Sequence, residues 1–417
     1  MDRVQPAAGL SDPYKNPELF RWLDSLEGVP DWLGPAETDA ERAGWSDWQR
    51  RGNHIFALVG TMVPGLVLAF TIAMAGRVLA NLPNSAFGFE NTPLSPILVS
   101  IILGLFIRNA IGLPTVYEAG LQLALKKVLR VGVALLGIRL SLAATGAIGL
   151  VALPIVTVCI ATALFFVTRV GAAIGLPPRL ATLIAVGTAI CGNSAIIAMA
   201  PVIDATDDEV SYAVGCITIF GLAALMFYPY LGHLIFDGDA TLIGLFMGTA
   251  IHDTAQVAGA GMVYLAQYGS AEVLDAATVT KLQRNMFMLA VIPLMAFYSN
   301  RSRATGSIRS QIRAALPMFV FGFLAMSLLR TLGDMGEHPF GIMSPETWSM
   351  LISWATKTAT LCLAVAMSAV GLGTSFTKLR GLGVRPLLVG LFAAALVGCV
   401  SYVLVSVAAP YTAGIGG

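Results

Sequence analysis

The sequence predicts an all-α polytopic membrane protein with about 11 transmembrane helices, and three observations carry this prediction. Hydrophobic residues make up 56% of the 417 residues and charged residues only 12%, about half the charged share of a typical soluble domain. Apolar runs of about 20 residues, the length that spans a bilayer, recur from residue 54 to residue 409. Polar and apolar residues do not alternate within these runs, which argues against a transmembrane β-barrel.

The polar remainder of the chain excludes several function classes. The net charge is +1, so there is no electrostatic basis for binding nucleic acid. The chain has no Walker A loop, HExxH motif or GxSxG motif, so we expect neither an ATP-driven pump nor an enzyme of these kinds. The five cysteines lie in apolar segments without a CxxC pair, and we expect no bound metal and no cofactor.

Residues 1–52 differ from the rest and are expected to form a cytoplasmic amphipathic N-terminal arm. They contain six basic and ten acidic residues, and residues 1–30 lack the apolar run of a cleavable signal peptide. The segment 18–28 has apolar residues at helical spacing and predicts a short helix on the membrane surface. A second short helix is expected near Trp45 and Trp48. Residues 53–417 are then the transmembrane transporter domain.

Eleven membrane spans are predicted, and the charges of the loops test this number. The spans are placed at 54–80, 94–113, 123–142, 146–169, 180–201, 210–236, 240–265, 282–299, 314–333, 348–372 and 386–409. Loops on one side of the membrane then carry sixteen Lys and Arg residues, and those on the other side carry five. The positive-inside rule therefore places the N-terminus in the cytoplasm and the C-terminus outside.

Internal similarity predicts an inverted repeat, with approximate repeats at 54–205 and 240–409. The segment VALLGIRLSL (133–142) is similar to AMSAVGLGTS (366–375). Aligning Gly137 with Gly371 pairs each span with the span seven further along the chain. Spans paired in this way have opposite orientations, as an inverted-topology repeat requires. Such repeats are typical of transporters with discontinuous helices and a core-plus-scaffold arrangement.

A second internal similarity marks two helices that we expect to be broken. GTAICGNSA (187–195) and GTAIHDTAQ (248–256) share GTAI at an offset of 61 residues. Gly192 and Asn193 disfavour a continuous helix, and Asp253 with Gln256 has the spacing of a capping box. Polar groups in hydrocarbon need partners, so these segments are expected to face protein or a wet cavity.

The same two motifs supply most candidate site residues. His252 and Asp253 are ionisable residues inside a predicted span, where such residues are usually functional, and they are the candidates for coupling to H⁺ or Na⁺. Lys357 is the only lysine deep within a predicted span and is the candidate cation for an anionic substrate. The expected substrate-binding residues are Thr188, Cys191, Gly192, Asn193, Ser194, His252, Asp253, Thr254, Gln256 and Lys357.

Five segments of the chain together resemble the YeiH-like family, which is named as a family of sulfate exporters. They are GTAICGNSAIIAMAPVI, DDEVSYAV, GLFMGTAIHDTAQVAGAG, KLQRNMFML and AVAMSAVGLGTSF, and the resemblance covers about residues 54–409. It implies a bacterial inner-membrane protein related to the bile-acid symporters and NhaA-type antiporters. In those carriers, broken helices from opposite repeats cross within a mobile core. The two GTAI spans are predicted to be parallel, so either spans 3 and 10 form the crossing or one GTAI segment is re-entrant.

The expected function is secondary transport of a small inorganic or organic anion, such as sulfate, sulfite or a sulfonate, by an elevator type of alternating access. Half-helix N-termini would hold the anion. The alternatives are a Na⁺/H⁺ antiporter that uses Asp253, a bicarbonate-type anion carrier, or an intramembrane enzyme or sensor that uses Cys191 and His252. The expected partners are the anion, the lipid bilayer and, by analogy, a second copy in a homodimer, with no nucleic acid.

Overall fold

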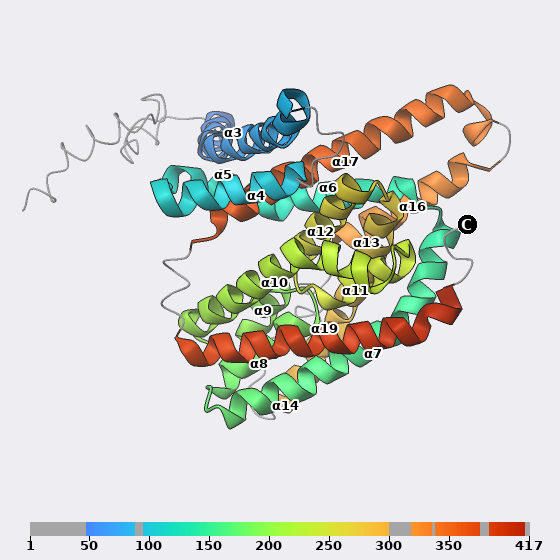
Figure 1. Ribbon diagram of the computed structural model, residues 1–417. Helices are drawn as coiled ribbons and strands as arrows, with labels where there is room; N and C mark the ends of the chain where they lie inside the picture. Colours follow the sequence, from blue (N-terminus) through green and yellow to red (C-terminus); the bar gives the residue numbers. More distant parts are fainter. Residues whose placement is uncertain (1–46, 88–94, 300–317, 336–337, 376–382, 413–417) are drawn as a thin grey trace, which may run out of the picture. The chain divides into compact units, whose positions relative to one another are not determined.

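The computed structural model describes residues 47–87, 95–299, 318–335, 338–375 and 383–412, and these residues are helical with short connections (Figure 1). No strand occurs in these ranges. The chain divides into two compact units, Met1–Pro64 and Gly65–Gly417. The predicted helix at 18–28 and Trp45 lie outside the described residues. The first unit is described only as the beginning of helix α3 (Asp47–Phe87), which includes Trp48.

Five helical segments are long and apolar enough to cross a membrane. They are Gly60–Ala80 within α3, Leu142–Ala173 (α7), Asp208–Ile235 within α10 (Asp207–Ile235), Pro345–Gly373 (α17) and Val384–Thr412 (α19). Each coincides with one of the eleven predicted spans. The prediction of a helical membrane protein is therefore confirmed for these elements, whereas the number of eleven spans and the inverted repeat remain predictions.

The other predicted spans coincide with shorter or interrupted helices. The second contains α4 (Pro96–Phe106) and the third contains α6 (Leu129–Leu136), while α5 (Glu118–Leu123) lies between these two predicted spans. A π-helical turn at Ile107–Ile111 extends α4, and another at Ala124–Val128 joins α5 to α6. The fifth contains α8 (Pro178–Ala189) and α9 (Asn193–Met199), the seventh contains α11 (Ala240–Ala250) and α12 (Thr254–Tyr268), and the ninth contains α16 (Met318–Gly333).

One predicted boundary was wrong. Span 8 was predicted at 282–299, and Lys281 and Arg284 near its start were counted among the five basic residues of the loops outside the cytoplasm. Instead, helix α13 runs from Ala271 to Met286, and α14 (Met288–Ser299) follows it. Most of α13 is buried, including Lys281 and Arg284, so these two cations belong to the interior. The error arose because an apolar-run criterion cannot recognise a buried helix that is rich in polar residues.

Within Gly65–Gly417 the helices form two groups. In the first group α17 packs along α4 and α6, and α16 packs on α6 (Figure 1). In the second group α13 packs against α7, α11 and α12, while α10 and α19 pack against α8 and α11. Contacts of α12 with α4 and α17, and of α16 with α7, join the two groups.

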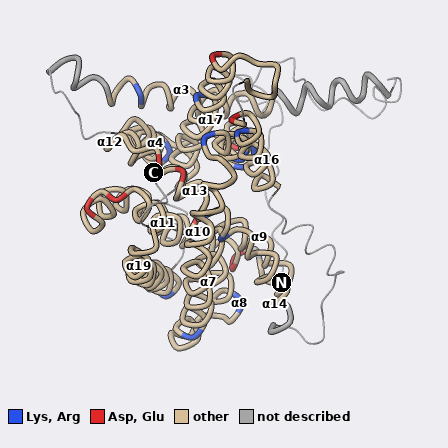
Figure 2. Tube along the Cα trace, turned by 90° about the vertical axis from the view of Figure 1, so that its right-hand side faces the viewer, with Lys and Arg blue, Asp and Glu red and all other residues tan. Residues whose placement is uncertain are grey.

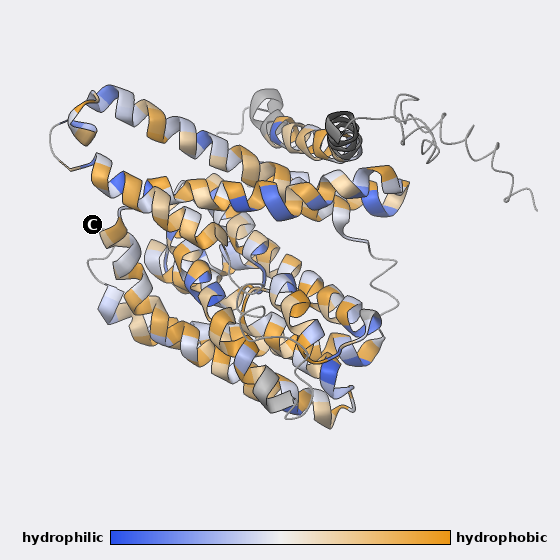
Figure 3. Cartoon of the chain, turned by 180° about the vertical axis from the view of Figure 1, so that it is seen from behind, coloured by the Kyte–Doolittle hydropathy of each residue, from blue (hydrophilic) through white to orange (hydrophobic). Residues whose placement is uncertain are grey.

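The outward-facing surface is apolar, as a lipid environment requires. Leu150 of α7 and Leu234 of α10 are each 75% exposed, and Val407 of α19 is 66% exposed. Figure 3 shows mostly orange and pale residues along the helices, and Figure 2 shows long stretches of chain without charged residues. Soluble monomers rarely expose large contiguous apolar areas, so the surface agrees with a membrane protein.

Candidate functional site

The first break interrupts the helix that contains GTAICGNSA. Helix α8 ends at Ala189, and α9 begins at Asn193. Gly192 between them has φ 70° and ψ −125°, a backbone conformation that residues with a Cβ rarely adopt. The predicted interruption near Gly192 is therefore present, and glycine is required there by the backbone. We call residues Ile190–Gly192 the first break.

The second break interrupts the helix that contains GTAIHDTAQ. Helix α11 ends at Ala250, and Ile251 is extended, with φ −80° and ψ 136°. Asp253 then caps α12 through the predicted capping box: Ala255 N donates to Asp253 Oδ1 at 2.8 Å, and Asp253 N donates to Gln256 Oε1 at 3.2 Å. We call residues Ile251–His252 the second break.

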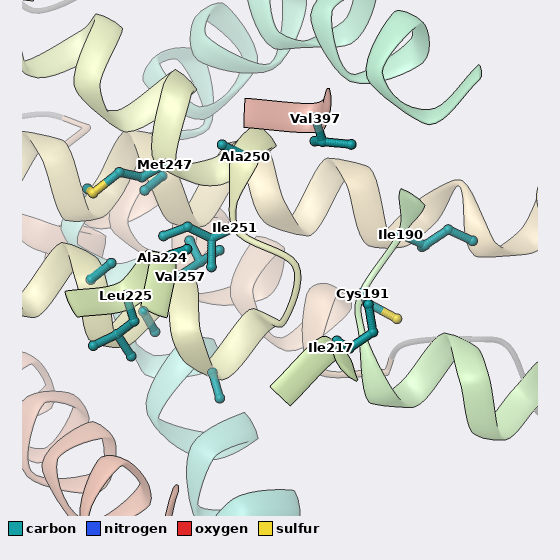
Figure 4. Packing of buried hydrophobic residues seen from close by; sticks show 14 of the residues in the cluster. Ile190, Cys191, Ile217, Ala224, Leu225, Met247, Ala250, Ile251, Val257 and Val397 are labelled. Atoms are coloured by element: carbon teal, nitrogen blue, oxygen red, sulfur yellow. The ribbon is translucent and has the colours of Figure 1, made fainter. Parts of the chain in front are cut away.

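The two breaks meet, and we call this place the junction. Asn193 N donates to Asp253 Oδ2 at 3.4 Å, so one carboxylate accepts hydrogen bonds from the first turns of both α9 and α12. A Cβ on Gly192 would lie 2.8 Å from Asp253 Oδ2 and 3.1 Å from its Cα, which is closer than packing allows. Figure 4 shows the ribbon thinning to coil beside Ile190 and Cys191, and again beyond Ile251. Neither of the two crossing arrangements left open by the sequence included this direct contact.

Lys281 of α13 is fully buried and holds the carbonyl ends of both breaks. Its Nζ donates to Ile190 O at 3.0 Å and to Ile251 O at 2.9 Å, and it also donates to His252 O. Carbonyl groups at a helix C-terminus lack intrahelical partners and carry the negative end of the helix dipole. The ammonium group therefore satisfies backbone groups of two helices at once and offsets their charge.

Arg284 lies one turn further along α13, is also fully buried, and acts on the same two helices. Its guanidinium donates to Thr188 O and to Ala189 O of α8, the latter at 2.7 Å, and to Thr249 O of α11. The spacing of three residues places both cations on one face of α13. Sequence reasoning missed this pair, although KLQRN between two apolar stretches contains the signal.

The remaining candidates in the first motif differ in accessibility. Thr188 and Cys191 are buried, and Cys191 Sγ lies 3.7 Å from Met288 Sδ. Asn193 is partly exposed and Ser194 is exposed. The side chains that a solute could reach on this side of the junction are therefore those of Asn193 and Ser194.

In the second motif, His252 is buried, whereas Asp253 and Thr254 are partly exposed. Asn285 of α13, which sequence reasoning did not select, donates to Thr254 Oγ1 at 3.1 Å. Gln256 completes the capping box, and its Nε2 donates to Thr218 O at 3.4 Å. The accessible groups Asp253 and Thr254 are thus held by α12 itself and by α13.

Lys357 is placed apart from these contacts. It is exposed on α17, and among the described residues it makes no hydrogen bond or ion pair. The cations that contact the two broken helices are Lys281 and Arg284. Among the described residues, no three His, Cys, Asp or Glu side chains are grouped so that they could hold a metal ion.

An ion pair links α13 to the first helix group. Arg139, which follows α6 in a 3-10 turn, places Nε 3.1 Å from Asp275 Oδ1. Both side chains are largely buried, at 14% and 10% exposure. The helix that holds the two breaks is thus tied to the group formed by α4, α6, α16 and α17.

Comparison with known proteins places this chain in a family. The model of the family described as Conserved hypothetical protein 698 matches residues 64–390. A UPF0324 membrane protein of Bacillus cereus is 32% identical over 82% of this chain and 93% of its own length. A UPF0324 membrane protein of Fusobacterium nucleatum is 30% identical over 78% of this chain and 92% of its length, and one of Agrobacterium fabrum is 29% identical over 82% and 92%. No solved structure matches the chain.

Proposed function

Because the chain belongs to the Conserved hypothetical protein 698 family, whose curated relatives are named as membrane proteins, we propose that it is a secondary transporter of a small anion across the bacterial inner membrane. The observation that carries the proposal is the junction of two interrupted helices at Gly192 and Asp253. Discontinuous helices that present free backbone groups to a shared site are characteristic of secondary transporters.

The charges at the junction favour an anion. Lys281 and Arg284 contribute two formal positive charges and Asp253 one formal negative charge, which leaves one positive charge in excess. The dipoles of two helix C-termini and two helix N-termini offset one another. An uncompensated charge within a membrane protein is unfavourable, so an anion entering the junction would gain from it.

The partly exposed groups are suited to hold an oxyanion. Ser194 and Thr254 offer hydroxyl groups and Asn193 offers an amide, all at the first turns of α9 and α12. Sulfate, sulfite, a sulfonate and bicarbonate all have oxygens that such donors bind. Asp253 opposes an anion there, so loss of its charge by protonation or by binding a cation would couple that ion to transport.

The two helix groups offer a route for alternating access of the elevator type. The junction and its buried cations belong to the group of α7, α8 and α10–α13, whereas α4, α6, α16 and α17 form the other group. Displacement of one group against the other would carry the junction between the two sides of the membrane.

Transport itself is tested by flux in proteoliposomes. We expect saturable uptake of radiolabelled sulfate or sulfite and faster uptake when the same anion is inside, which is counterflow. A channel would show conductance without counterflow, and an enzyme or sensor would move nothing. Exchange of Na⁺ for H⁺ without anion flux would instead favour the antiporter that uses Asp253.

Replacing Asp253 by Asn should separate coupling from folding. Asn keeps one oxygen for the cap of α12 but presents an amide donor to Asn193 N, so we expect the protein to fold with a free energy of unfolding lower by about 1–3 kcal/mol. The charge that opposes the anion is removed, so counterflow should continue but lose its dependence on pH or Na⁺. Initial rates across a range of pH, with and without Na⁺, measure this. A variant that keeps the parent's dependence would exclude Asp253 as the coupling group.

The orientation of the chain can be measured separately. We propose a cytoplasmic N-terminus and an extracytoplasmic C-terminus, because basic residues are concentrated in one set of predicted loops. The burial of Lys281 and Arg284 removes two of the five basic residues that had been assigned to the opposite side, which strengthens the asymmetry. Reporter fusions should be active in the cytoplasm at the N-terminus and outside it at the C-terminus. Both termini on one side would refute an odd number of spans.

A further inference from the structure

Unpaired polar atoms are concentrated around the junction. Among the described residues, eight buried side-chain oxygen or nitrogen atoms have no hydrogen-bond partner, and six of them belong to α13 or to the ends of the two broken helices: those of Thr188, Asn193, His252, Thr280, Gln283 and Asn285. Folded proteins pair nearly all buried polar atoms, and exceptions often mark a site for a ligand, an ion or water.

Asn285 is the most informative of these residues. The residue is 1% exposed, its Nδ2 donates to Thr254 Oγ1 at 3.1 Å, and its Oδ1 has no partner among the described residues. Asn193 is the second such residue: its Oδ1 is also buried and unpaired, and its backbone N–H contacts the Asp253 carboxylate. Two residues with unpaired amide oxygens, one on α9 and one on α13, therefore contact the pair Asp253–Thr254.

The oxygen atoms of these residues determine which class of ion the site can hold. A carboxylate, two amide oxygens and a hydroxyl are hard oxygen ligands, which suit hard cations such as Na⁺, Mg²⁺ and Ca²⁺. Only one of them is charged, and Lys281 and Arg284 lie on the carbonyl side of the same breaks. A second positive charge on the ion would be repelled by these two cations, so the set favours a monovalent ion.

We propose that Asn193, Asp253, Thr254 and Asn285 form a binding site for Na⁺. The site follows from the oxygen ligands alone, and its coupling role rests on the proposed function. Na⁺ at this place offsets the charge of Asp253, which opposes an anion at the first turns of α9 and α12. The bound cation therefore raises the affinity for the anion, and by linkage the anion raises the affinity for Na⁺ by the same factor.

Thermal unfolding of the purified protein in detergent tests the site without any transport. Samples in NaCl, KCl and choline chloride are compared at equal ionic strength. We expect a saturable rise of the unfolding midpoint in NaCl only, of roughly 5 °C at a concentration about 100 times the Kd, because a ligand that binds only the folded state stabilises it. Equal midpoints in all three salts would overturn the proposal.

Variants of Asn285 assign the shift to the site. Asn285→Ala removes the unpaired oxygen and should abolish the Na⁺ shift, whereas Asn285→Asp keeps an oxygen ligand and should retain it. Gln267→Ala is the matched control, since Gln267 also has a buried, unpaired amide oxygen but lies near the far end of α12. We expect it to keep the parent's shift. An Asn285→Ala protein with the parent's shift, or an Asn285→Asp protein that folds without one, would overturn the assignment.

Sulfate titrations with and without Na⁺ test the coupling. We expect the apparent affinity for sulfate to rise by a factor of about 5 or more in Na⁺, the lower end of typical coupling between sites. A rise of the unfolding midpoint in NaCl without any effect of Na⁺ on the affinity for sulfate would overturn the coupling but not the Na⁺ site. Binding of Na⁺ by a protein that neither binds nor moves an anion would overturn the proposed function and leave the site.

Discussion

Replacing Lys281 by Met should lower the free energy of unfolding by about 3–5 kcal/mol, the range for breaking a buried charged network by removing one partner. Methionine fills similar space but donates no hydrogen bond. The carbonyl groups of Ile190, Ile251 and His252 would then lose their contact with Nζ inside the protein, where each unpaired group costs about 1–3 kcal/mol. The Asp253 carboxylate would also lose a nearby positive charge.

The matched control for this variant is Lys357→Met. It makes the same chemical change on an exposed part of α17, where Lys357 has no hydrogen bond or ion pair with any described residue. We expect its free energy of unfolding to stay within about 0.5 kcal/mol of the parent's, the range of neutral surface substitutions, as judged by thermal unfolding in detergent. Equal stability of the Lys281→Met protein and this control would show that the carbonyl ends of the breaks find other partners.

The two lysines show what hydropathy can and cannot predict. Lys357 lies within a long apolar run, and this made it the candidate cation, but its side of α17 is exposed. Lys281 lies in a helix with several polar residues, which resembled a loop, yet α13 is enclosed by α7, α11 and α12. Burial of a polar helix depends on which elements surround it, and a single sequence does not contain that information directly.

The breaks themselves were predictable because their causes are local. Gly192, Asn193 and the pair Asp253 with Gln256 act through backbone conformation and capping, which depend on neighbours within four residues. The contact between Asn193 and Asp253 joins residues 60 positions apart, so it depends on packing. The shared GTAI indicated two similar segments without indicating that they touch.

The shared dependence on Lys281 and Arg284 also explains how two breaks can exist in an apolar interior. Each break exposes carbonyl groups at the end of one half-helix and N–H groups at the start of the next. The two cations of α13 donate hydrogen bonds to carbonyl groups of both broken helices. The Asp253 carboxylate accepts hydrogen bonds from N–H groups at the starts of both second halves. Neither break is self-sufficient, so we expect the two broken helices to be formed together.

Replacing Gly192 by Ala should destabilise the junction by about 2–6 kcal/mol. The backbone at φ 70° and ψ −125° is strained for any residue with a Cβ, at a cost of about 1–3 kcal/mol. The added methyl group would also lie 2.8 Å from Asp253 Oδ2 and 3.0 Å from Asp253 Cβ, and such overpacking typically costs a further 1–3 kcal/mol, roughly. Relief of this clash would separate Asp253 from Asn193 N, so the coupling ion and the anion should both bind more weakly.

Gly146→Ala is the matched control, because a Cβ there would meet nothing within 4 Å. Gly146 lies in the continuous helix α7, where alanine is favoured over glycine by about 0.5–1 kcal/mol, so this variant should be as stable as the parent or more so. Thermal unfolding in detergent and anion counterflow in proteoliposomes measure both variants. If Gly192→Ala unfolds at the parent's midpoint and transports at the parent's rate, the two breaks do not meet at Gly192 and Asp253 in the working protein.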